Sequence, residues 1–331
     1  MKAWIVKSFG EPSVLERVEL PRPEPGPGEV LVEVAATSVN PVDVKIRRLG
    51  LPIAPELPGV LHGDVAGVVV AVGAGVTAFR PGDEVFGCAG GVRGSGGALA
   101  EFMVADARLL AHRPRTLTLV ESAALPLVAI TAWEAMIDKA VILPGDRVLV
   151  HAGVGGVGHL AVQLAKWRGA VVAATVSSAA KGEAALVLGA DRVIDYRTTS
   201  VADYVEALTG GQGFDVVFDT VGMGNLDGSF QAARAGGAVV TCVARSTHDL
   251  SPLHAKGLSL HVVFMLLPLL TGRGRERHGE ILRRVSELVD AGKIRPLIHE
   301  RRYSFDEVPA AHAALEAGEA FGKILIRVAA R

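Results

Sequence analysis

The chain contains very little cysteine. Only two cysteines, Cys88 and Cys242, occur among 331 residues, and they lie far apart in the sequence. Neither belongs to a C-x-x-C pair, so the sequence predicts neither a disulfide framework nor a zinc site built from thiolates. Sparse, unpaired cysteine is typical of a reducing compartment, and we therefore expect a cytoplasmic protein.

The chain also lacks an excess of charge and a long apolar run. Lys and Arg total 34 against 35 Asp and Glu, whereas a nucleic-acid-binding protein normally shows a basic stripe or domain. The most apolar stretch, residues 262–270, is interrupted by Pro268 and is too short to span a bilayer. The N-terminal residues lack the apolar core of a signal peptide. We expect no nucleic-acid partner and no membrane partner.

Two domains are expected, because single cores usually stop growing near about 250–300 residues. Up to about residue 120, β-rich runs such as residues 30–34 and 67–72 alternate with Pro- and Gly-rich turns such as residues 21–28. Proline and glycine at that density break helices and set turn dihedrals. This first part therefore predicts a compact β-barrel-like domain.

From about residue 125, short Val- and Ile-rich runs alternate with Ala- and Leu-rich helical stretches. The expected strands are residues 147–151, 171–176, 192–196, 214–218 and 238–242. Strands that alternate with helices in this way predict βαβ units and a parallel sheet. After about residue 265, we expect a long helix over residues 280–291 and a last strand over residues 324–328.

The sharpest signal is a glycine motif at residues 151–158. Gly153, Gly155 and Gly158 satisfy G-x-G-x-x-G, and the motif follows an expected strand and opens an expected helix. The glycines permit a tight turn, close approach of the backbone to a pyrophosphate, and packing of helix on strand, while the helix N-terminus offers amides to the phosphates. The motif therefore predicts a dinucleotide site at Gly153, Val154, Gly155, Gly156, Val157 and Gly158.

The end of the second expected strand indicates which nicotinamide cofactor binds. An NAD site places a carboxylate there to hold the ribose 2′-hydroxyl. Here no carboxylate is present, and Ser177, Ser178 and Lys181 offer two hydroxyls and a cation that suit a 2′-phosphate. The alternative is that Ser178 caps the next helix and Lys181 is a solvated surface charge. The local chemistry favours NADPH, with NADH as a weaker cofactor.

Several segments, in their order and separations, resemble the medium-chain dehydrogenase/reductase superfamily. They include residues 40–43, 63–69, 81–85, 144–148, 188–191, 214–219 and 322–323. The resemblance implies an α/β protein with a GroES-like β-barrel catalytic domain and a Rossmann NADP-binding domain with a doubly wound parallel sheet. The first would comprise residues 1–124 and 266–331, the second residues 125–265. The two ends of the chain would pair in the first domain.

Zinc ligands of this superfamily are missing from the expected positions. Zinc-dependent alcohol dehydrogenases have a catalytic Cys where this chain has Asn40, and a His where it has Gly63. His62 is one residue out of register, so a shifted site of His62 and Asp64 remains an alternative, but no third ligand is found. The resemblance therefore implies no zinc. Lacking a Lewis acid, the protein is expected to act on an acceptor that is already electrophilic.

The resemblance is to the zinc-free quinone oxidoreductase (zeta-crystallin-like) branch. It implies an enzyme that transfers hydride from NADPH to a quinone or to the activated C=C bond of an α,β-unsaturated carbonyl, with a small electrophilic molecule as substrate. The alternatives are a zinc-dependent alcohol dehydrogenase with an unorthodox site and a non-catalytic, NADPH-binding regulatory protein. Relatives are commonly homodimers joined through Rossmann-domain edges, and residues 258–264 are the candidate edge strand.

The resemblance assigns further roles to individual residues. Asn40 would lie beside the nicotinamide and Thr131 would line its pocket, whereas their plain alternatives are a turn residue and a helix-interior threonine. Tyr196 would contact the 2′-phosphate or be a half-buried strand-end aromatic, and the backbone at Val243 and Ala244 would run along the nicotinamide ring.

Three more residues are candidates for the substrate pocket. They are Asp43, His62 and Phe264. A role as a helix cap explains Asp43 equally well, and a role as a core residue is the alternative for Phe264. The cations that follow Asp43, namely Lys45, Arg47 and Arg48, would suit a polar or acidic substrate or form a solvated face.

Overall fold

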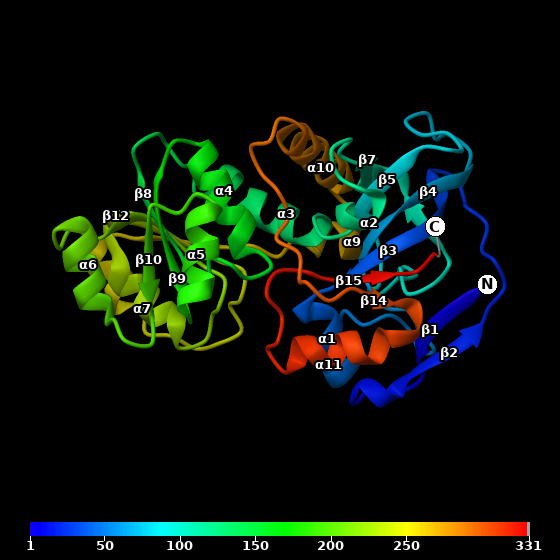
Figure 1. The fold of residues 1–331 in the computed structure, drawn as a ribbon, viewed down its shortest axis with the longest axis horizontal. Coiled ribbons are helices and arrows are strands. Elements are labelled where there is room, and N and C mark those ends of the chain that lie inside the picture. The colour runs from blue at the N-terminus through cyan, green and yellow to red at the C-terminus, as the bar shows by residue number, and fades with distance from the viewer. Residues whose placement is uncertain (330–331) are drawn as a thin grey trace. The chain divides into compact units, whose positions relative to one another are not determined.

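The structure is a computed structural model that describes residues 1–329. The chain divides into two compact units (Figure 1), which we call unit 1 and unit 2. Unit 1 comprises the chain up to Ile130 and from Leu266 onward, and unit 2 comprises Thr131–Met265. The division falls inside helix α3 (Pro126–Trp133), whereas the sequence placed it before that helix. The two units are defined by contacts within the structure, and the predicted domains, residues 1–124 with 266–331 and residues 125–265, remain a prediction.

Unit 2 contains one six-stranded sheet in which each neighbouring pair of strands is parallel. Its strands are β8 (Arg147–Val150), β9 (Val171–Val176), β10 (Arg192–Asp195), β11 (Phe214–Asp219), β12 (Ala233–Thr241) and β13 (Ser259–Val262). Their order, β10-β9-β8-β11-β12-β13, is the doubly wound order in which the chain reverses direction at β8. The predicted Rossmann sheet is confirmed. Strand β13 ends the sheet, as expected of residues 258–264.

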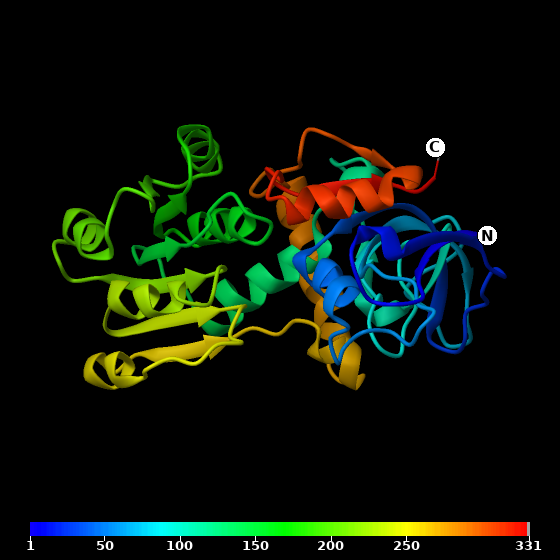
Figure 2. The same ribbon diagram turned by 90° about the horizontal axis from the view of Figure 1, so that it is seen from below.

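Helices cover both faces of this sheet (Figures 1 and 2). They are α4 (Gly158–Trp167), α5 (Ala179–Val187), α6 (Val201–Thr209), α7 (Asn225–Ala232) and α8 (Ser251–Lys256). Strands buried on both faces read as continuous apolar runs, which is why Leu149, Val217 and Val239 are fully buried in the core.

Unit 1 is built on a mostly antiparallel sheet of order β14-β15-β3-β4-β5-β7, with β6 also paired to β3. The strands are β3 (Glu29–Val39), β4 (Asp64–Val72), β5 (Glu84–Cys88), β6 (Phe102–Asp106), β7 (Leu110–His112), β14 (Tyr303–Ser304) and β15 (Ile324–Arg327). A separate pair consists of β1 (Lys2–Val6) and β2 (Leu15–Glu19). Because β15 pairs with the C-terminal half of β3, segments from the two ends of the chain meet in one sheet, as predicted.

The remaining helices include one whose bounds differ from the sequence prediction. They are α1 (Pro41–Leu49), α2 (Leu119–Ser122), the π-helix η3 (Glu134–Lys139), α9 (Leu267–Thr271), α10 (Arg275–Asp290) and α11 (Val308–Glu316), with short 3₁₀ turns between. Helix α10 begins at Arg275 rather than residue 280 and ends at Asp290 rather than residue 291. The sequence pattern missed its first turn because that turn is polar and carries no apolar periodicity. The last strand ends at Arg327 rather than residue 328. Among residues 1–329, every helix is too short or too polar to cross a membrane.

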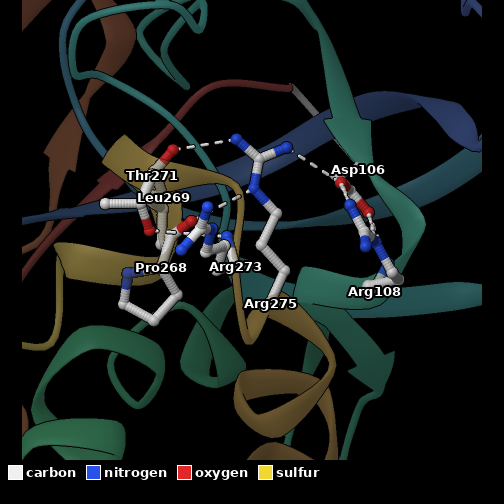
Figure 3. A network of polar contacts seen from close by, with 7 residues as sticks. All are labelled: Asp106, Arg108, Pro268, Leu269, Thr271, Arg273 and Arg275. Atoms are coloured by element: carbon white, nitrogen blue, oxygen red, sulfur yellow. Dashed lines mark hydrogen bonds and ion pairs between the residues drawn. The ribbon is translucent and has the colours of Figure 1, made fainter.

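An arginine fixes the start of α10 to the sheet of unit 1 (Figure 3). Arg275 forms an ion pair of 2.9 Å with Asp106 and donates a hydrogen bond of 2.8 Å to the carbonyl of Leu269. Asp106 is also paired with Arg108 at 2.8 Å, and these contacts hold its pKa down to about 2 against the opposing effect of burial. A shallow hollow beside this network is lined by Leu267, Pro268, Thr271 and Arg273, none of which was predicted to contact cofactor or substrate.

Candidate active site

The predicted glycine motif forms the turn between β8 and α4. Gly153 and Gly158 are required by packing within the chain, because an added Cβ would lie 2.5 Å from the Cβ of Ala174 and 2.1 Å from the carbonyl oxygen of Ala152 respectively. Ala152 itself adopts a φ of 51°, a conformation that non-glycine residues rarely occupy. The turn is therefore as tight as the motif predicts.

Gly155 differs from its two neighbours. A Cβ added there would meet only the carbonyl oxygen and the Cβ of Ala152, at 3.1 and 3.7 Å. Packing within the chain therefore does not forbid a side chain at this position, but a side chain would cover backbone that is otherwise open. In a dinucleotide site the second glycine leaves room for the pyrophosphate. The turn and the N-terminus of α4 fit such a group.

The residues predicted for the 2′-phosphate gather at the carboxyl ends of β9 and β10. The ammonium of Lys181 donates a hydrogen bond of 3.2 Å to the hydroxyl of Ser177. The amide of Tyr196 donates a hydrogen bond of 3.3 Å to the carbonyl of Val176, so Tyr196 follows the strand beside Ser177. Ser178 accepts a hydrogen bond from the amide of Lys181, which shows that its capping role is correct. Tyr196 is 57% exposed rather than half-buried.

Two other features stand at the carboxyl ends of the strands. The hydroxyl of Thr241 bonds to both the amide and the carbonyl of Val243, which fixes the chain just after β12, where Ala244 is exposed. His151, the first residue after β8, is 4% exposed, and its Nε2 has no hydrogen-bond partner among the described residues. Burial lowers the pKa of His151. The sequence analysis did not select this histidine.

In unit 1, Asn40 and Asp43 begin helix α1 and are buried. The carboxylate of Asp43 accepts a hydrogen bond of 2.8 Å from the backbone amide of Asn40, and the two residues form a capping box. Pro41 occupies the first turn and Gly50 ends the helix in the left-handed conformation. The alternatives of a turn residue and a helix cap are therefore correct, although they do not exclude a further role.

Asn40 also belongs to a buried polar network that joins four parts of the chain. Its Nδ2 donates a hydrogen bond of 2.7 Å to Asp64, and its Oδ1 accepts one from the ammonium of Lys323. Lys323 also donates to the carbonyl of Val39 at 3.2 Å and lies 3.6 Å from the carboxylate of Asp64. Asp64 further accepts hydrogen bonds from the Ser38 hydroxyl and the Leu127 amide.

The charges in this network affect one another. Burial and the neighbouring Asp64 raise the pKa of Asp43 to about 7. Burial lowers the pKa of Lys323, although Asp64 and Asp43 oppose that shift. Burial likewise raises the pKa of the Cys88 thiol. A lysine buried against two carboxylates therefore compensates charges that could not be buried alone.

His62 lies next to this network and pairs with a second histidine. Its Nδ1 is 3.1 Å from the Thr37 hydroxyl, and its Nε2 is 2.8 Å from the Nε2 of His312. The two rings stack with centroids 5.0 Å apart. Burial lowers the pKa of both, that of His312 to about 3. Sequence reasoning missed His312 and named Lys323 only within a closing Gly-Lys, because nothing local links either residue to Asn40.

The geometry bears on the alternative of a shifted metal site. The two ring nitrogens of His62 face Thr37 and His312, whereas the carboxylate of Asp64 contacts Ser38, Asn40, Leu127 and Lys323. At Gly63, an added Cβ would lie 2.9 Å from the Cys88 sulfur. Within residues 1–329, no group of three or more His, Cys, Asp or Glu side chains is arranged to hold a metal ion.

The other candidate residues are placed as follows. Thr131 is buried in α3, and Phe264 is 45% exposed, so the alternative of a core role for Phe264 is wrong. Arg47 is fully buried and pairs with Glu316 at 2.5 Å, so it belongs neither to a solvated face nor to a run of three free cations.

Comparison with known proteins gives two family matches and many relatives. The family described as "Alcohol dehydrogenase GroES-like domain" matches residues 26–115, and the family described as "Zinc-binding dehydrogenase" matches residues 188–326. The chain is 36% identical to the 2-methylene-furan-3-one reductase of Solanum lycopersicum, over 98% of this chain and 79% of that protein. It is 33% identical to the chloroplastic NADPH-dependent alkenal/one oxidoreductase of Arabidopsis thaliana, with the same coverage. A quinone oxidoreductase of Escherichia coli, solved with NADPH, superimposes with a TM-score of 0.89 at 29% identity and covers 99% of this chain and 100% of that one.

Proposed function

This chain belongs to the medium-chain dehydrogenase/reductase superfamily and is an oxidoreductase, and on that basis we propose that it transfers hydride from NADPH to a quinone or to an α,β-unsaturated carbonyl without zinc. The observation that carries the proposal is the glycine turn of unit 2. Gly155 leaves the backbone open to a pyrophosphate, and Ser177, Lys181 and Tyr196 follow at the ends of the next strands. The named relatives use NADPH or reduce enones and quinones, which supports the same chemistry here.

The bound nicotinamide supplies the hydride chemistry, and the residues of this chain bind and orient it. Lys181 and Ser177 would hold the 2′-phosphate by charge-assisted hydrogen bonds. In unit 1, two residues fix the orientation of the Asn40 side-chain amide. Asp64 accepts a hydrogen bond from its Nδ2, and Lys323 donates one to its Oδ1. The second N–H of Nδ2 would then donate to the carbonyl of an acceptor as negative charge develops on its oxygen.

Zinc independence is part of the proposal. It is supported by Gly63, which carries no ligand, and by His62, whose two nitrogens already face Thr37 and His312. A polarised quinone or enone accepts hydride without a Lewis acid. We also propose a cytoplasmic homodimer that uses the β13 edge, by analogy with relatives.

The proposal is tested by following the oxidation of NADPH and of NADH by purified protein, with EDTA present, against a panel of quinones and α,β-unsaturated carbonyls. We expect turnover that prefers NADPH and survives EDTA, and the best acceptor will distinguish quinone from enone. Turnover that requires one tightly bound zinc per chain would instead support the alcohol dehydrogenase alternative. Tight NADPH binding without turnover on any acceptor would support a regulatory role.

A further inference from the structure

Unit 2 contains a Ser–His–Asp arrangement that the proposed function has not used. The hydroxyl of Ser246 lies 2.6 Å from Nε2 of His248, and Nδ1 of His248 lies 2.7 Å from the carboxylate of Asp227. A base that is hydrogen-bonded to a hydroxyl and oriented by a third group is the geometric signature of general acid–base and nucleophilic sites. The three residues are close in space although Asp227 belongs to α7 and the others to the loop after β12.

The imidazole of His248 is held between Ser246 and Asp227, and both of these residues are accessible to solvent. An ionised carboxylate only accepts hydrogen bonds, so the hydrogen on Nδ1 points to Asp227. Nε2 accepts from Ser246 when the imidazole is neutral and donates to Ser246 when the imidazole is protonated. The ring of Phe230 meets the imidazole edge-on, at 84° and 6.1 Å between centroids. The side chain of His248 is 9% exposed and that of Asp227 is 54% exposed, while Ser246 is partly exposed. A proton can therefore reach the histidine from solvent.

The position of this arrangement in the sheet matches the nicotinamide end of a dinucleotide. In the doubly wound order, β8, β9 and β10 form the first mononucleotide-binding half, which carries the glycine turn and Lys181. The second half, β11 to β13, then serves the nicotinamide. Strand β12 runs parallel to β8 and lies two strand positions away, about 10 Å. The loop that carries Ser246 and His248 therefore leaves the same sheet edge, two residues beyond the predicted nicotinamide contact at Ala244.

We propose that Ser246, His248 and Asp227 form the proton relay that completes reduction of an α,β-unsaturated carbonyl. The inference rests on the proposed function, and it supplies the proton donor that hydride transfer leaves unassigned. Ser246 is the catalytic residue that touches the substrate, and His248 and Asp227 act through it. None of the three relay residues lies in the glycine turn or in the buried network of unit 1.

The step balances in protons and electrons. Hydride from NADPH bonds to the β-carbon, and the electron pair of the C=C bond moves to give an enolate. The enolate α-carbon takes the proton of the Ser246 hydroxyl, and the Nε2 proton of the His248 imidazolium passes to the Ser246 oxygen. His248 is left neutral and takes a proton from solvent, while Asp227 stabilises the imidazolium in each cycle. The products are the saturated carbonyl and NADP⁺.

The experiment compares wild-type protein with His248→Ala, Ser246→Ala and, as a matched control on the same loop, Thr247→Ala. The substrate is an enone that carries a methyl group on its α-carbon, so the face of protonation is recorded in the configuration of the product. NADPH affinity is measured by fluorescence titration, and imidazole is added to each variant as an external proton carrier. Thr247 is exposed and is not part of the relay.

We expect His248→Ala and Ser246→Ala to lower kcat by about 100-fold with NADPH affinity unchanged, and Thr247→Ala to retain wild-type kcat. Imidazole should restore turnover to His248→Ala, and both relay variants should give a mixture of configurations at the α-carbon. If His248→Ala and Ser246→Ala both turn over as fast as the wild-type protein, the relay is overturned and the proposed function is not. The relay is also overturned if kcat falls only in step with NADPH affinity, if imidazole restores no turnover, and if the product keeps a single configuration at the α-carbon. That result would mean that His248 only holds the loop in place. Failure of wild-type protein with every enone, while quinones are reduced, overturns the relay and leaves the proposed function. Failure with every enone and every quinone overturns both.

Discussion

The glycine turn of unit 2 and the buried polar network of unit 1 solve opposite problems. The turn removes side chains so that backbone amides remain open to a ligand, and its glycines lie within residues 151–158. The network fills a core with polar side chains that satisfy one another, and it draws on Asn40, Asp64 and Lys323, which β15 and β3 bring together. The glycines of the turn are near one another in the sequence, whereas the network forms only because strands from distant parts of the chain pair.

This comparison also separates two kinds of sensitivity. In the turn, a small side chain changes either packing or ligand access, depending on which glycine it replaces. In the network, loss of one partner leaves a buried charge or donor without compensation. The predictions below test this difference, beginning with the largest expected effect.

Replacing Lys323 with Met should have the largest effect on stability. The change leaves the carboxylates of Asp64 and Asp43 buried without their cation, which typically costs about 3–5 kcal/mol of unfolding free energy. The measurement is the urea-unfolding midpoint and slope of Lys323→Met. The double variant Lys323→Met with Asp64→Asn should recover much of the loss, because it removes the carboxylate nearest to the lost cation. A loss below about 1 kcal/mol for the single variant would contradict the network's role.

Two alanine substitutions should separate packing from ligand access in the turn. Gly158→Ala forces a Cβ against the Ala152 carbonyl and should destabilise the protein by about 1–3 kcal/mol. Gly155→Ala should change the unfolding free energy by less than about 1 kcal/mol but weaken NADPH binding roughly tenfold. Urea unfolding and NADPH fluorescence titration measure the two effects. If Gly158→Ala and Gly155→Ala changed the unfolding free energy and the NADPH affinity equally, the two glycines could not be assigned separate roles in packing and in ligand access.

The paired histidines should make stability fall in mild acid. Their pKa values are lowered in the folded state, so below the ordinary value of 6.5 the unfolded chain binds more protons and is favoured. Each histidine contributes a slope of up to about 1.4 kcal/mol per pH unit, continuing toward pH 3 for His312. His312→Phe should reduce the slope of unfolding free energy against pH between about 6 and 4.5. An unchanged slope would show that the pair is not neutral in the folded protein.

Asp43 contributes with the opposite sign. Its pKa is raised from 3.8 to about 7, so its contribution to stability is fully present below 3.8 and is lost as pH rises through about 7. Asp43→Asn should therefore steepen the acid destabilisation that the histidines cause. The same titration of unfolding free energy against pH measures this change, and a flatter profile in the variant would contradict it.

The smallest expected effect is at Lys181, which is partly exposed. Lys181→Ala should weaken NADPH binding roughly fivefold, about 1 kcal/mol, because solvent screens the ion pair with the 2′-phosphate. NADH affinity should stay unchanged. Arg192→Ala, at the amino end of β10, removes a cation from the opposite edge of the sheet and should affect neither cofactor. Equal losses for NADPH and NADH in Lys181→Ala would contradict the 2′-phosphate assignment.

Features that depend on consecutive residues could be predicted from the sequence. The alternation of strands and helices indicated the parallel sheet, and the glycine motif with Ser177, Ser178 and Lys181 indicated the cofactor turn, because a strand, a turn and a helix follow one another within about 30 residues. The helix cap at Asp43 was likewise one of the alternatives considered, and a capping box spans only four consecutive residues.

Contacts between distant residues became visible only in the folded structure. It placed Lys323 against Asn40 and Asp64, His312 against His62, and Glu316 against Arg47. It also placed Asp227 beside His248, although a helix and a strand separate them in the sequence. Strand pairing and helix packing bring these side chains within hydrogen-bond distance, and the interactions act only at that distance. Their partners are therefore fixed by the fold rather than by any pattern along the chain.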